Sequence, residues 1–165
     1  MTATITKEIK TYFITNTIGY NLVALLINRP TLGITNSPTN DQLLLRENLT
    51  MATAVDQEVS STGYQRYIAT VDSEDIVYSN GQATVSVTAT FTAPTNSSIG
   101  PFTHIVWTRG ANLIGATSAN GNNRGNTNGT VWKVELVNQV ANTGQALTLQ
   151  AGATYSTTTD ITITV

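Results

Sequence analysis

The stretch Gly81–Ala93 (GQATVSVTATFTA) alternates apolar and hydroxyl-bearing positions almost without interruption. Successive side chains of a strand point to opposite faces, so the pattern predicts a strand with one apolar and one hydroxyl face. The predicted apolar face holds Ala83, Val85, Val87, Ala89, Phe91 and Ala93, and the hydroxyl face holds Thr84, Ser86, Thr88, Thr90 and Thr92. The polar face of this stretch carries no acid, base or metal ligand, so we expect no reactive chemistry on it.

Further strands are predicted from short apolar or alternating runs bounded by turn residues. They are expected at Tyr64–Val71, Asp75–Ser79, Gln82–Ala93, Phe102–Arg109, Asn112–Ala116, Thr130–Asn138, Ala146–Gln150 and Ile161–Val165. Asn80-Gly81 is a strong hairpin-turn dipeptide. In Thr130–Asn138 we expect Trp132, Val134 and Leu136 to face inward and Lys133 and Glu135 outward. This spacing predicts a mainly β fold, an antiparallel β-sandwich or jelly-roll-like structure, with Gln82–Ala93 central and Phe102–Arg109 as its partner.

The length of 165 residues favours one domain, 1–165. Residues 1–19 are expected to form an N-terminal helix or arm, and Tyr20–Asn28 a buried strand or helix. Residues 30–62 look irregular, and Asp41–Met51 within them is interpreted as a short helix or an extended arm. Because so long a connection usually has a function, we expect this segment to contact a neighbouring subunit. Deleting Thr31–Val59 is then expected to leave a folded β-domain.

Composition excludes several classes of function. Cysteine is absent, which excludes disulfides and thiolate chemistry. Charged residues make up only 11% of the chain and the net charge is −2, so no basic surface for nucleic acid is expected. The N-terminus does not resemble a signal peptide, and the longest apolar run is too short to cross a membrane. Threonine makes up roughly a fifth of the chain, which suits solvated strands.

The candidate reactive residues have simpler structural interpretations. His104 is the only histidine, which excludes a site with two histidine ligands. Asp72, Glu74 and Asp75 match no EF-hand loop, so a solvated turn is favoured over a calcium ion shared between subunits. Their spacing does not show whether any two of the acids Asp41, Glu47, Glu58 and Asp160 lie close together. Trp107 and Trp132 follow the strand phase expected of core residues. If they were exposed, these two rings could stack on a sugar. No catalytic, metal or cofactor site is predicted, and no small-molecule substrate.

Several segments in order resemble a family of small β-sandwich structural proteins of tailed bacteriophages, described as tail-fibre-like or minor structural proteins. They are LVALLINRP (22–30), GYQRY (63–67), ATVSVTATFTA (83–93), FTHIVW (102–107), GANLIGA (110–116), LTLQAGATYS (147–156) and ITITV (161–165). The chain departs from the family pattern in the long 30–62 segment, in Gln65 where the family has Ala, and in the Asn/Gly-rich loop at 118–130.

The resemblance implies a non-enzymatic protein located in the virion and made in the host cytoplasm. A capsid decoration (cement) protein is favoured, with a tail, baseplate or tail-fibre component as the alternative and a carbohydrate-binding module as a distant one. Its partners would be capsid or tail subunits, and we expect a homo-oligomer. The expected subunit contacts are Leu43, Leu44, Leu45, Arg46, Leu49 and Met51 in the 30–62 segment, and Arg124 in the Asn/Gly-rich loop.

Overall fold

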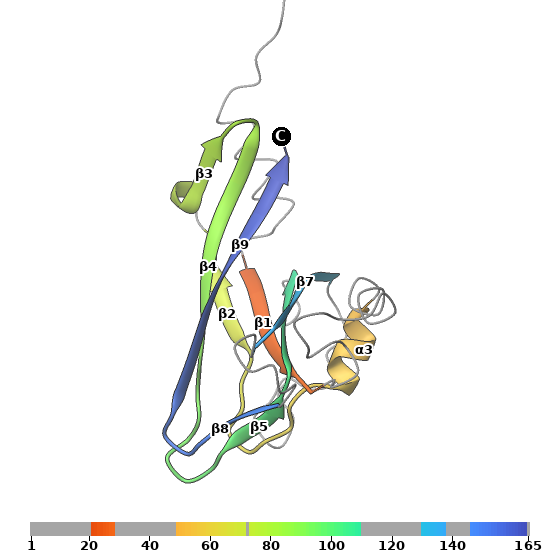
Figure 1. Cartoon of the computed structure of the whole chain (residues 1–165), viewed down its shortest axis with the longest axis vertical. Coiled ribbons are helices and arrows are strands. Elements are labelled where there is room, and N and C mark those ends of the chain that lie inside the picture. Colours follow the sequence, from red (N-terminus) through yellow and green to blue (C-terminus); the bar gives the residue numbers. More distant parts are fainter. Residues whose placement is uncertain (1–20, 29–48, 72, 110–129, 138–145, 165) are drawn as a thin grey trace, which may run out of the picture.

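The computed structural model describes residues 21–28, 49–71, 73–109, 130–137 and 146–164 (Figure 1). They form antiparallel sheets that pack against each other, so the predicted mainly β, sandwich-like fold class is confirmed. One sheet has the order β2-β1-β6-β7 and a second has the order β3-β4-β9, while β5 and β8 pair as a ribbon. The predicted N-terminal helix or arm, the strand at Asn112–Ala116 and the loop at 118–130 lie outside the described residues.

The four-stranded sheet is built around an apolar strand covered on both faces. It contains β1 (Asn21–Ile27), β2 (Tyr67–Thr70), β6 (His104–Arg109) and β7 (Thr130–Leu136). Residues 22–27 are all buried, because one face of β1 meets the other sheet and the opposite face meets helix α3 (Met51–Asp56). Two covered faces explain why Tyr20–Asn28 reads as a continuous apolar run.

The three-stranded sheet contains β3 (Ile76–Ser79), β4 (Gln82–Thr92) and β9 (Thr154–Thr164). Figure 1 shows β4 and β9 as a long ribbon, and they pair without a register shift from Gln82↔Thr164 to Thr92↔Thr154. Asn80 and Gly81 join β3 to β4 with φ angles of 50° and 73°. Positive φ at both positions is what a type I′ two-residue hairpin turn requires, so the predicted turn is confirmed.

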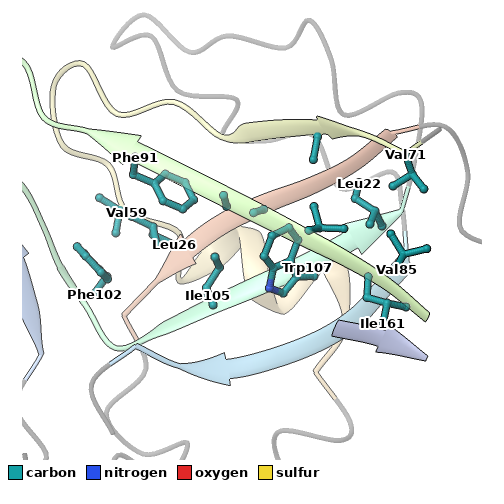
Figure 2. Packing of buried hydrophobic residues seen from close by; sticks show 14 of the residues in the cluster. Leu22, Leu26, Val59, Val71, Val85, Phe91, Phe102, Ile105, Trp107 and Ile161 are labelled. Carbon is teal, nitrogen blue, oxygen red and sulfur yellow. The ribbon is translucent and has the colours of Figure 1, made fainter. Parts of the chain in front are cut away.

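Two apolar clusters stabilise these layers. The larger cluster lies between the two sheets, and Figure 2 shows Trp107 and Ile105 of β6 within it, together with Val85 and Phe91 of β4. The smaller cluster joins the outer face of the four-stranded sheet to α3. The ribbon of β5 (Ile99–Phe102) and β8 (Leu147–Leu149) adds Phe102, which meets Tyr155 of β9 edge-on with ring centroids 5.7 Å apart.

The prediction for the neighbours of β4 was only partly right. Strand β4 is central in its sheet as expected, but its hydrogen-bonded neighbours are β3 and β9. The expected partner Phe102–Arg109 was wrong, because β6 pairs with β1 and β7 and meets β4 only across the core. Strand β9 also begins earlier than the predicted Ile161, because the Thr-rich stretch before Ile161 extends it.

Residues 30–62 were expected to be irregular, but their described part, 49–62, contains helix α3 and packs into the core of this chain. Thr50 caps α3 by accepting a hydrogen bond from the Thr53 N–H at 3.2 Å. Met51, Ala54 and Val55 then pack under the four-stranded sheet. After the helix, Val59 N–H donates to the Leu26 carbonyl at 2.9 Å and continues the β1 hydrogen bonding. Deletion of Thr31–Val59 would therefore remove core residues.

Candidate contact surface

The exposed face of β4 and β9 carries a ladder of paired hydroxyl side chains, here called the hydroxyl ladder. Four rungs are hydrogen-bonded hydroxyl pairs with oxygen–oxygen distances of 2.7–3.2 Å. In the fifth rung, Ser86 Oγ donates to Asp160 Oδ1. The rungs are Thr84–Thr162, Ser86–Asp160, Thr88–Thr158, Thr90–Ser156 and Thr92–Thr154. The hydroxyl face predicted for Gly81–Ala93 therefore exists, and it is twice as wide as one strand.

The rungs form because of the register of the two strands. Ala93 N–H donates to the Ala153 carbonyl at 2.9 Å, so this pair, next to the last rung, is a hydrogen-bonded pair of the ladder. Hydrogen-bonded and non-hydrogen-bonded pairs alternate, and every rung therefore falls on a non-hydrogen-bonded pair. Opposite Cα atoms lie about 4.5 Å apart in such pairs, which brings short side chains within hydrogen-bonding reach.

The hydroxyl ladder is almost uncharged. Asp160 is the only ionisable residue among its ten members. Neighbouring β3 adds the exposed side chains Val77 and Ser79 beside the ladder. A long surface of hydroxyl groups with one carboxylate has no acid–base pair for catalysis, but it offers regularly spaced hydrogen-bonding groups for contact with another molecule.

A second polar cluster holds β7 against β9. Lys133 Nζ donates to Thr159 Oγ1 at 2.6 Å and forms an ion pair with Glu135 at 2.7 Å. Glu135 also accepts hydrogen bonds from Thr159 at 2.7 Å and from Trp107 Nε1 at 3.1 Å. The prediction that Lys133 and Glu135 face outward was wrong, because these side chains lie at the join between the sheets, where the buried indole N–H needs an acceptor.

A third cluster is buried at the end of β1. Glu58 accepts two hydrogen bonds from Arg66, from Nε at 2.7 Å and from Nη2 at 2.6 Å, and both side chains are fully buried. Tyr64 OH donates to Glu58 at 3.2 Å and accepts the Leu26 N–H at 2.8 Å. Burial, followed by the Glu58 charge, raises the pKa of Tyr64 well above its usual value of 10.0.

The Glu58–Arg66 pair explains the GYQRY segment but gives no reactive site. The Glu58 carboxylate accepts its hydrogen bonds from Tyr64 and Arg66. Arg66 Nη1 is buried with no hydrogen-bond partner in the described part of the chain. Sequence reasoning missed this pair because its members lie eight positions apart along an irregular backbone.

A shallow pocket of about 240 Å³ opens between the Gly63–Tyr67 segment and the end of β4. It is lined by Gly63, Gln65, Arg66, Tyr67, Thr90, Phe91, Thr92 and Ile99. Arg66 is its only charged wall residue, and that charge is already paired with Glu58. The pocket therefore lacks the convergent acid–base groups of an active site.

The residues expected to make subunit contacts divide into two groups. Leu49 and Met51 are 6% and 5% exposed and pack in the smaller core cluster, so within this chain they join α3 to the sheet. Leu43, Leu44, Leu45, Arg46 and Arg124 lie outside the described residues. Within the described residues, the candidate contact surface is therefore the hydroxyl ladder and not the 30–62 segment.

The other candidate residues take structural positions. His104 is buried, and its Nδ1 lies 2.8 Å from Thr103 Oγ1. Trp107 is buried as predicted, whereas the side chain of Trp132 and Asp72 lie outside what the structure describes. Glu74 and Asp75 are exposed in a short 3-10 turn, and the described residues contain no group of three His, Asp or Glu able to hold a metal ion.

Among the acids considered for paired catalysis, Glu58 is bonded to Arg66 inside the core and Asp160 to Ser86 on the exposed ladder. Asp41 and Glu47 lie outside the described residues. No helix in the described part of the chain is long and apolar enough to cross a membrane. Comparisons of the chain with protein-family models, with curated proteins and with solved structures find no match.

Proposed function

We propose that this chain is a non-enzymatic structural protein of a tailed-phage virion, and that it acts as a capsid decoration protein that binds and stabilises adjacent capsid subunits. The proposal rests on the family resemblance of its segments and on one structural observation, the hydroxyl ladder. Five consecutive rungs on the exposed face of β4 and β9 give a long, nearly neutral surface. Such a surface suits contact with another protein better than capture of a small molecule.

The scaffold beneath the ladder supports this role. The apolar face of β4 packs in the larger core cluster together with Tyr155 and Ile161 of β9. Lys133 links β9 to the opposite sheet through Thr159 and the Asp160 carbonyl. The ladder is therefore preorganised, and binding does not require the strands to become ordered. A preorganised surface loses less entropy when it binds. Copies arrayed on a symmetric shell would also hold through several modest contacts at once.

We further propose that the chain acts as a homo-oligomer on the particle and needs no cofactor. The distant alternative, a carbohydrate-binding module, is weakened because the Trp107 ring is buried and cannot stack on a sugar. The tail alternative predicts the same kind of contact surface, so the two placements are separated by the particle that the chain binds.

The proposal is tested with capsids assembled from the major capsid protein encoded in the same genome, and with tails from the same phage. We expect the purified chain to co-sediment with the capsids at saturating stoichiometry and to raise their melting temperature. Binding to tails and not to capsids would support the tail alternative. Absence of binding to both particles would contradict the virion proposal.

A further inference from the structure

We infer that the hydroxyl ladder docks against a different protein, not against the same ladder of a second copy, and that this partner places one Lys or Arg side chain on Asp160. The inference rests on the proposed function and specifies the chemistry of its contact. It follows from the hydrogen-bonding capacity of the five rungs and from the single charge among them.

The hydrogen-bonding capacity differs between the rungs. A hydroxyl has one O–H donor and two acceptor lone pairs. Each hydroxyl–hydroxyl rung, such as Thr88–Thr158, uses one O–H within the rung and leaves the other O–H for a partner. The Ser86–Asp160 rung differs, because Ser86 donates its only O–H to the carboxylate and Asp160 has no donor. The ladder therefore presents donors and acceptors on both sides of its second rung, which can only accept.

The Ser86–Asp160 rung also carries a charge with no counter-charge among the described residues. The ion pairs of the described chain join Arg66 to Glu58 and Lys133 to Glu135. Lys133 reaches the backbone carbonyl of Asp160, at 3.2 Å, and its ionic partner is Glu135. In water the exposed carboxylate is solvated. A partner that covers the ladder must replace that water, since an unpaired buried charge is costly.

The same charge disfavours the ladder of a second copy as the occupant. The ten ladder residues contain one acid and no base, so the face is not complementary to itself. Two ladders placed face to face would bring two carboxylates into one interface without a cation. A partner with one Lys or Arg opposite Asp160 removes this penalty, and Arg can bind a carboxylate with two parallel hydrogen bonds.

The test uses the full chain and the capsid co-sedimentation assay, with the variants Asp160→Asn and Asp160→Lys. Asparagine keeps an oxygen that can accept from Ser86, so the rung and the fold are retained, and unchanged thermal unfolding verifies this. We expect Asp160→Asn to weaken capsid binding about 30-fold or more and Asp160→Lys to abolish it, because each leaves the partner's cation without its counter-charge. The matched control is Glu74→Gln, which removes an exposed acid that is not one of the ten ladder residues and should bind like the original chain.

The outcomes separate this inference from the proposed function. Capsid binding by the original chain that Asp160→Asn leaves unchanged would overturn the inference and leave the decoration role standing. Equal weakening by Glu74→Gln would also overturn it, because net charge would then explain the effect. Analytical ultracentrifugation of the free chain adds a further check. Self-association that becomes stronger in Asp160→Asn would show a second copy on the ladder and would overturn the inference.

Discussion

The hydroxyl of Tyr64 bonds the backbone N–H of Leu26, with the two atoms 2.8 Å apart. Strand β2 pairs with β1 only from Asn21↔Thr70 to Ala24↔Tyr67, so the chain has already left β1 at the level of Leu26. The tyrosine hydroxyl takes the place of the missing strand as the acceptor, and it donates its own O–H to Glu58. A side chain thus completes the backbone hydrogen bonding at the end of β1.

Replacing Tyr64 by phenylalanine should destabilise the protein, because the single hydroxyl that is removed makes two buried hydrogen bonds. In Tyr64→Phe the buried Leu26 N–H loses its acceptor and Glu58 loses a donor. An unsatisfied buried polar group costs about 1–3 kcal/mol, so we expect a decrease of that size in the free energy of unfolding. Urea denaturation followed by circular dichroism measures it. The matched control is Tyr67→Phe, at a half-buried ring, which should change stability much less, and equal losses in both variants would contradict the explanation.

The raised pKa of Tyr64 predicts a loss of stability in alkali. Burial and the Glu58 charge keep the proton on Tyr64 in the folded chain above its usual pKa of 10.0. The unfolded chain releases this proton near pH 10, so above that pH the unfolded state binds fewer protons and is favoured by linkage. Stability should therefore fall as pH rises above about 10. The decline should be shallower in Tyr64→Phe, and identical pH slopes for both proteins would contradict it.

The buried pair of Glu58 and Arg66 should behave as a unit. Glu58→Gln leaves the Arg66 charge buried without a counter-charge, which costs about 3–5 kcal/mol. Replacing both residues by leucine removes both charges, and such replacements are often neutral or stabilising. We expect the double variant to be more stable in urea denaturation than Glu58→Leu alone or Arg66→Leu alone. Additive losses in the double-mutant cycle would show that the two charges are not coupled.

Helix α3 supplies a test of the role of the 30–62 segment. Met51 is 5% exposed and packs between α3 and the sheet. Truncating such a side chain costs about 2–5 kcal/mol, so Met51→Ala should lower the unfolding midpoint strongly. Ala52 is exposed on the same helix, and Ala52→Ser is the matched control with little expected effect. A stable Met51→Ala protein would return Met51 to the surface role first predicted for it.

The sequence predicted β4 well because its two faces differ, one buried and one exposed. It failed for Lys133 and Glu135, since alternation shows which residues share a face but not whether a second sheet covers the polar one. The start of β9 was missed because threonines occupy consecutive positions there, so no alternation marks the strand. The pairing of Asp160 with Ser86 depends on a register set by residues 74 positions apart, which no local pattern contains.

The hydroxyl ladder should contribute more to contact than to stability. In the double variant Thr88→Val, Thr158→Val one rung loses both hydroxyls but keeps its β-branched shape and strand preference. Cross-strand pairs of this kind contribute about 0.2–1 kcal/mol, so unfolding should change by no more than that. If the ladder is the docking face, capsid binding should weaken clearly, because the variant removes a free donor from the centre of the surface. Unchanged binding with unchanged stability would place the docking face elsewhere on the molecule.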